Sequence, residues 1–232
     1  MEYVLEMKDI SKTFSGVKAL DNVQLKVRHG EVHALMGENG AGKSTLMKIL
    51  MGIYTKDEGG EILFDGKPYR AASPKEAMDC GVAMIHQELN PILDMTVFEN
   101  IFVGRELKKN GMVDTKAEIQ EAQRLIAECG LHVSPKARLR SLTVAQCQLI
   151  EIIKAISLNA KVIIMDEPTA AITDREVELL FGHIRRLTAQ GVAVIYISHR
   201  MDEIFSICDR VSVYRTDSTS ARAIPKTWTR RS

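Results

Sequence analysis

The sequence lacks any apolar run long enough to cross a bilayer. Its longest apolar stretches, 162–165 and 192–197, are far shorter than the ~18 residues that a membrane-spanning helix needs. The N-terminus also lacks the basic region and the long apolar core of a secretory signal. We therefore expect no transmembrane helix, and we expect the protein to lie in the cytoplasm.

Cysteine clusters and excess charge are absent as well. The four cysteines, Cys80, Cys129, Cys147 and Cys208, are widely separated and lack the paired spacing of zinc sites, so we expect buried, reduced thiols. The 232-residue chain has a net charge of +1, without the basic bias of nucleic-acid-binding proteins. Its 45% hydrophobic and 26% charged residues are typical of a globular protein with a substantial core.

A glycine-rich segment is the strongest motif that the sequence does contain. Residues 37–45 fit the phosphate-binding pattern of Gly, four residues, Gly, Lys and Ser/Thr. The segment follows an expected strand at 31–36 and precedes apolar residues at helical spacing, so a phosphate loop is favoured over a plain glycine-rich turn. Its glycines allow backbone N–H groups to turn inward, and the following helix directs its positive dipole end at the same place.

This motif predicts a nucleotide triphosphate site. We expect Lys43 to reach the β and γ phosphates and the Ser44 hydroxyl to bind Mg²⁺. The residues of the loop expected to contact the nucleotide are Gly37, Glu38, Asn39, Gly40, Ala41, Gly42, Lys43, Ser44 and Thr45.

The order of expected strands and helices indicates an α/β fold. Strand patterns near the N-terminus predict antiparallel pairing, and the later alternation of strand, helix and strand predicts a parallel sheet. The expected strands are 5–10, 23–27, 61–64, 82–85, 162–165 and 192–197. One expected helix has Ser73 as its N-cap and Pro74 at its first helical position and is stopped by Gly81, another spans 117–129 with Asp114 as its N-cap, and a further one spans 174–190. The helical residues at about 97–158 read as an insertion between strands.

Two features near the expected strand ends have alternative readings. Asp166 and Glu167 close a buried-looking strand and could form a solvated turn, but their place downstream of a phosphate loop favours Mg²⁺ binding by Asp166 and water activation by Glu167. Phe14 could stack on an adenine or fill the core.

Five segments in this order resemble the nucleotide-binding subunit of an ATP-binding cassette (ABC) transporter. They are the phosphate loop, Gln87, residues 142–146 at the start of an expected helix, Asp166–Glu167 and Ser198–His199, and the resemblance covers about residues 3–214. Segments 85–90, 99–105, 166–170 and 196–204 are most similar to bacterial importers of ribose, galactose and other monosaccharides.

The resemblance implies a P-loop NTPase core with a mostly parallel sheet, an N-terminal antiparallel β subdomain and an inserted α-helical subdomain. The core would span 1–87 and 161–214, the insertion about 88–160, and a divergent, disordered tail 215–232. The implied protein hydrolyses ATP with Mg²⁺ at the cytoplasmic face of the cell membrane. Its implied partners are a second cassette, a membrane permease and, indirectly, a periplasmic or extracellular sugar-binding protein, with no nucleic acid.

The resemblance also implies residue roles. Phe14 would stack on adenine, Gln87 would contact Mg²⁺ or the attacking water, and His199 would hydrogen-bond the γ phosphate, unless His199 is a core histidine. The implied catalytic residues are Lys43, Gln87, Glu167 and His199; the implied metal ligands are Ser44, Gln87 and Asp166; and Thr143, Ala145 and Gln146 would contact nucleotide held by the second cassette.

Two departures from the family pattern bear on activity. Residues 142–146 read Leu-Thr-Val-Ala-Gln where most members have Leu-Ser-Gly-Gly-Gln, and the methyl group of Ala145 predicts a weakened composite site. After residue 214 the family continues with another strand and, in sugar importers, a second cassette, so we expect a truncated or altered reading frame here.

This departure leaves two alternatives to a working importer ATPase. One is a catalytically impaired cassette fragment. The other is a cassette ATPase acting on nucleic acid or ribosomes. This alternative is disfavoured because residues 1–214 have a net charge of −3, since five basic side chains against one acidic lie in the tail.

Overall fold

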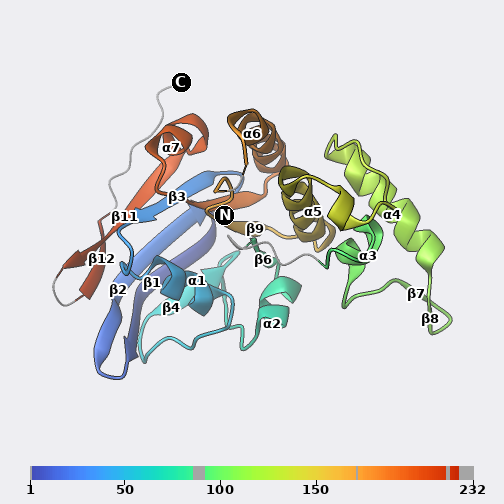
Figure 1. Cartoon of the computed structure of the whole chain (residues 1–232). Helices are drawn as coiled ribbons and strands as arrows, with labels where there is room; N and C mark the ends of the chain where they lie inside the picture. The colour runs from blue at the N-terminus through green and yellow to red at the C-terminus, as the bar shows by residue number, and fades with distance from the viewer. Residues whose placement is uncertain (1, 86–91, 171, 218–219, 225–232) are drawn as a thin grey trace. The chain divides into compact units, whose positions relative to one another are not determined.

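The computed structural model describes residues 2–85, 92–170, 172–217 and 220–224, and they fall into two compact units (Figure 1). The first unit comprises Met1–Met84, Ala160–Glu167 and Ile184–Ser232, and the second comprises Ile85–Asn159 and Pro168–His183. None of the helices in the described part of the chain is long and apolar enough to span a membrane.

The first unit contains a four-stranded antiparallel sheet. Its strands run in the order β2-β1-β4-β5 and comprise β1 (Tyr3–Phe14), β2 (Val17–Arg28), β4 (Glu61–Phe64) and β5 (Lys67–Pro68). The turn between β1 and β2 places Ser15 and Gly16 at positive φ, which lets the two strands pair closely. The predicted antiparallel region is confirmed, although β1 extends further than the apolar pattern indicated.

A six-stranded sheet forms the rest of this unit's framework. Its order is β12-β11-β3-β10-β9-β6, with β3 (Val32–Gly37), β6 (Val82–Ile85), β9 (Val162–Asp166), β10 (Ala193–Ile197), β11 (Arg210–Asp217) and β12 (Ser220–Ile224). Strands β11, β3, β10 and β9 are parallel neighbours. The predicted parallel sheet is therefore confirmed, and the C-terminal ends of these strands lie at one edge.

Strand β12 occupies residues for which the sequence indicated no regular structure. It pairs antiparallel with β11, from Val213 opposite Ile224 to Asp217 opposite Ser220. Pairing with an existing sheet edge can hold a strand whose side chains show no apolar alternation. In this described part of the tail, the structure differs from the expected disorder.

Among the residues that the structure describes, three helices lie wholly in the first unit and a fourth has residues in both units. They are α1 (Lys43–Leu50), α2 (Pro74–Asp79), α7 (Met201–Ile207) and the shared α6 (Asp174–Ala189). Helix α2 starts as its sequence predicts, with the Ser73 side chain accepting from the Glu76 N–H and proline at the first helical position. The buried core joins Leu46 and Leu50 of α1 to Leu25 of the antiparallel sheet and to Leu35 and Ile195 of the other.

The second unit is mostly helical, in agreement with the expected insertion. Its elements are α3 (Val97–Phe102), β7 (Lys108–Lys109), β8 (Met112–Val113), α4 (Thr115–Glu128), the 3₁₀ helix η1 (Leu139–Ser141) and α5 (Val144–Ser157). Asp114 caps α4 as predicted, and Ile101, Ile126 and Ile150 belong to a core shared by α3, α4 and α5.

The cysteines agree only partly with the expectation of buried thiols. Cys147 and Cys208 are buried, but Cys129 is half-buried and Cys80 is exposed, and none of these four described residues forms a disulfide. Burial raises the pKa of the Cys147 thiol.

Candidate functional site

The phosphate loop has the backbone geometry that the glycines predict. Gly37, Gly40 and Gly42 have φ values of 149°, 85° and 85°. A side chain at Gly37 would place its Cβ 2.4 Å from the Tyr214 carbonyl oxygen, whereas Gly40 has open space around it. Gly37 is therefore required for close packing, and Gly40 is required for its backbone conformation alone.

The N-terminus of α1 is open to an anion. Helix α1 begins at Lys43 with Gly42 as its N-cap, and no side chain of the described residues caps it. The N–H groups of a first helical turn have no intrahelical partner, and the helix dipole makes this end positive. The loop and helix together therefore fit a phosphate group.

Lys43 lies back over its own loop. Its Nζ donates to the carbonyl oxygens of Gly37 at 2.6 Å and Glu38 at 2.9 Å. Burial lowers the pKa of the Lys43 ammonium, and the negative charges of Asp166 and Glu167 oppose that shift. The structure thus brings the loop lysine and the two strand-end carboxylates into one electrostatic neighbourhood.

The parallel strands bring Glu167 and His199 together. The backbone N–H of Glu167 donates to the Ile197 carbonyl at 2.9 Å, and His199 Nδ1 lies 3.0 Å from Glu167 Oε1. The His199 side chain is 75% exposed, so it is not a core histidine. Glu167 has φ +45°, an unfavourable conformation for a residue with a side chain, and such residues cluster at functional sites.

A buried carboxylate that the sequence analysis missed supports the segment carrying His199. Glu203 is 2% exposed and accepts from the Tyr196 hydroxyl at 2.8 Å and the Ser198 hydroxyl at 3.1 Å. Arg200 Nη1 lies 2.8 Å from the same carboxyl group. The sequence signal that could have indicated Glu203 is its place as an acidic residue in the first turn of the helix that follows β10.

Phe14 is exposed rather than a core residue. The residue is 37% exposed, and its ring packs edge-on against Tyr54, with 5.1 Å between the ring centroids. Lys12 Nζ lies 5.3 Å from the Phe14 centroid. Of the two readings of Phe14, the core plug is wrong, while adenine stacking stays a prediction. The partnership with Tyr54 was not apparent from the sequence.

The remaining predicted residues lie elsewhere. Thr143, Ala145 and Gln146 belong to the second unit at the start of α5, where the Thr143 hydroxyl accepts from the Gln146 N–H at 3.2 Å and the Gln146 side chain accepts from the Thr143 N–H at 3.0 Å. This reciprocal capping confirms the predicted helix start. Gln87 lies outside the described residues.

Comparison with known proteins gives both a family and close relatives. The ABC transporter family model matches residues 20–170. The chain is 52% identical over 214 residues to the galactose/methyl galactoside import ATP-binding protein MglA of Escherichia coli strain K12, and equally to MglA of Shigella flexneri. The match covers 92% of this chain but 42% of each relative, so the chain spans less than half the length of these curated relatives.

Solved structures share the fold. An ATP-binding cassette of an ABC transporter in its ADP conformation is 30% identical, with a TM-score of 0.81 over 97% of this chain and 90% of that one. The cbiO1 protein of Clostridium perfringens, part of the ABC transporter complex cbiONQ, is 25% identical, with a TM-score of 0.80 over 97% of this chain and 88% of its own.

Proposed function

This chain belongs to the ABC transporter family, and we propose that it hydrolyses ATP to drive import of a monosaccharide through a membrane permease. One observation carries the proposal. At the edge of the parallel sheet, Lys43 interacts electrostatically with Asp166 and Glu167, and His199 contacts Glu167. A triphosphate on the loop would lie beside an acceptor for a proton and a hydrogen-bonding imidazole.

The chain's own residues would divide the chemistry as follows. Lys43 and the N–H groups of the loop stabilise negative charge on the β and γ phosphates. Glu167 accepts a proton from the water that attacks the γ phosphorus, while the bond from that phosphorus to the ADP oxygen breaks. His199 hydrogen-bonds the γ phosphate and, through its contact with Glu167, holds the carboxylate in place.

Magnesium would be held by Ser44 and Asp166, with Gln87 as the third expected ligand. Hydroxyl and carboxylate oxygens suit this ion, which would neutralise phosphate charge when bound. The open helix end and the carboxylates near Lys43 are the features of this structure that fit the pair of ATP and metal.

The relatives support the proposed partners and location. MglA is named as an import protein for galactose and methyl galactoside, and this supports a monosaccharide as cargo and the cytoplasmic membrane face as the place of work. A second cassette would receive Thr143, Ala145 and Gln146 across a shared nucleotide site. A sugar-binding protein outside the membrane would act indirectly, through the permease.

The proposal is tested with the purified chain and Mg-ATP. We expect ATP binding by the chain alone, slow hydrolysis, and faster hydrolysis when the chain is added to proteoliposomes that contain the permease. The measurements are ATP binding by calorimetry and phosphate release. A chain that binds no ATP, or that hydrolyses it faster only when nucleic acid is added, would contradict the proposal.

Replacing Ala145 with glycine tests the expected weakness of the shared site. We expect faster ATP hydrolysis by the complete transporter, by about severalfold, because removing the methyl group lets the backbone N–H approach the phosphate more closely. The matched control is Ala127→Gly, the same change at an exposed position of α4. Unchanged turnover in Ala145→Gly would count against this explanation.

A further inference from the structure

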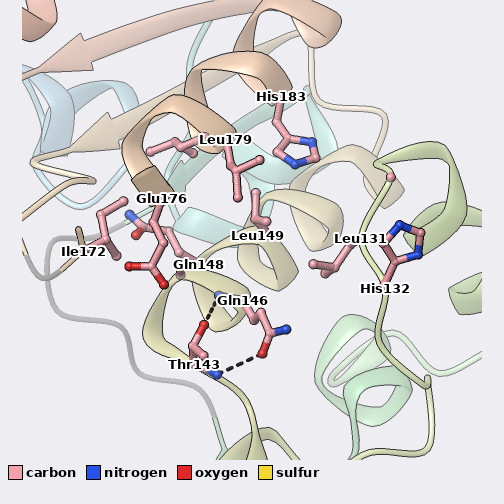
Figure 2. A pocket seen from close by; sticks show the side chains of 13 residues that line it. Leu131, His132, Thr143, Gln146, Gln148, Leu149, Ile172, Glu176, Leu179 and His183 are labelled. Carbon is pink, nitrogen blue, oxygen red and sulfur yellow. Dashed lines mark hydrogen bonds between the residues drawn. The ribbon is translucent and has the colours of Figure 1, made fainter. Parts of the chain in front are cut away.

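The second unit contains a cavity of about 400 Å³ beside the N-terminus of α5 (Figure 2). This volume is within the usual range for small-molecule sites. Helices α5 and α6 and the segment after α4 supply its walls, and the lining residues are Gly130, Leu131, His132, Thr143, Ala145, Gln146, Gln148, Leu149, Ile172, Glu176, Leu179, Leu180 and His183. All of them belong to this one unit.

Most of the wall is apolar. Leu149 and Leu180 are almost fully buried, whereas Leu179 is 58% exposed although it lines the cavity. Leu131 and Ile172 add further apolar surface. An occupant would therefore gain free energy by removing the leucine side chains from water.

Among the described residues, the wall of the cavity carries one fixed charge, and that charge is negative. None of the described residues that line the cavity is a lysine or an arginine, and Glu176 is the one carboxylate among them. The Thr173 backbone N–H and hydroxyl both donate to Glu176 Oε2 at 2.9 Å, and these bonds hold the pKa of the carboxyl below its usual value. Glu176 is therefore ionised at neutral pH.

Glu176 can accept a further donor. Both bonds from Thr173 end on Oε2, and Oε1 receives no hydrogen bond from the described residues. In Figure 2 the carboxylate lies on the side of Thr143 and Gln146, while the His183 and His132 rings lie on the other side of Leu149 and Leu131. A ligand could thus place a hydrogen-bond donor beside the Glu176 carboxylate and an apolar body against the leucine side chains.

We propose that this cavity binds a small organic cation, an ammonium group carried on an apolar body. The ammonium would donate to Glu176 Oε1, and the body would pack on Leu131, Leu149 and Leu179. An organic anion of the same shape would meet the Glu176 charge with no compensating lysine or arginine in the wall. A metal ion is a poor alternative, because the described residues include no cluster of three His, Cys, Asp or Glu side chains able to hold one.

Three probes with one apolar body separate charge from shape: 4-phenylbutylamine, 4-phenylbutanol and 4-phenylbutyrate. Binding to the purified chain is measured by calorimetry and by the NMR signals of the His132 and His183 rings. We expect the amine to bind about fivefold more tightly than the alcohol, as for a favourable exposed ion pair, and the carboxylate to bind most weakly. Equal binding of the three probes, or His132 and His183 signals that do not move, would overturn the proposal.

Two substitutions assign the preference to Glu176. Glu176→Gln keeps an oxygen that can accept from Thr173 but removes the charge, so the amine should bind no better than the alcohol. Glu178→Gln, an exposed position two residues along α6 that does not line the cavity, should leave the preference intact. Amine preference that survives in Glu176→Gln would refute the assignment.

A third substitution tests the cavity itself. Leu131 is half-buried at the wall of the cavity, so the larger side chain of Leu131→Trp should fill the space and weaken the binding of all three probes. Probe binding unchanged in this variant would place the ligand elsewhere. None of these measurements uses ATP, so the proposed ligand site and the proposed ATPase function can fail independently.

Discussion

Glu167→Gln should lower ATP turnover by at least about a hundredfold while ATP binding is retained, because a positioned general base contributes on this scale. Glutamine preserves the length of the side chain and can still contact His199, which lies 3.0 Å from Glu167 Oε1. It cannot accept the proton of the attacking water. The substitution therefore removes one chemical property and little else.

The measurements are single-turnover phosphate release and ATP affinity on the same preparation, with Glu178→Gln as the control on an exposed surface. Glu167 has φ +45°, and glutamine meets about the same backbone cost there as glutamate, so the stability of Glu167→Gln should stay close to that of the original protein. Turnover within a few-fold of the original would show that Glu167 is not the base.

Arg210→Met should destabilise the first unit by about 3 kcal/mol at neutral pH, the lower end of what breaking a buried ion pair costs. Arg210 Nη1 lies 3.3 Å from Glu31 Oε1, and Glu31 is 6% exposed. Without Arg210, Glu31 would be a buried carboxylate that keeps the His33 ring, 3.0 Å away, the backbone N–H of Arg28 and the more distant charge of the Arg28 guanidinium. Because these interactions with Glu31 remain, we expect a loss of stability at the lower end of the range for breaking a buried ion pair.

The destabilisation should shrink as the pH falls. Burial alone would raise the pKa of Glu31, but the His33 hydrogen bond, the Arg28 N–H and the charges of His33 and Arg210 together hold that pKa below its usual value. A carboxyl whose folded-state pKa is depressed adds stability above its unfolded pKa, and loses it as the pH falls through the folded value. Arg210→Met should raise the pKa of Glu31. Once Glu31 is protonated it is neutral, so the loss of the arginine charge costs less stability.

Urea unfolding of both proteins at about pH 7 and about pH 5 checks this expectation. Arg124→Met is the control, since Arg124 forms ion pairs with Glu121 and Glu128 on an exposed face of α4, and its loss should change stability much less. An equal loss of stability in the two variants, or a difference that grows in acid, would contradict the role given to Glu31 and Arg210.

Local chemistry explains why much of the fold could be predicted. Ser73 with Pro74, Asp114, and Thr143 with Gln146 each start a helix through bonds within one turn, and the structure confirms all three starts. Apolar runs such as β9 and β10 are buried strands for the same local reason. The tail strand β12 was not predicted, because only its partner β11 makes it a strand.

The sequence by itself therefore determined the phosphate loop, the helices and strands around it and the family. Each of these depends on residues close together in the chain, whose spacing sets the local backbone geometry. Tertiary structure alone decided that His199, which follows β10, contacts Glu167, which follows β9, and that Glu176 faces a cavity lined by residues from α5 and the segment after α4. The physical reason is that these contacts join residues far apart in the chain. Their distances depend on how strands and helices pack, which local spacing does not encode.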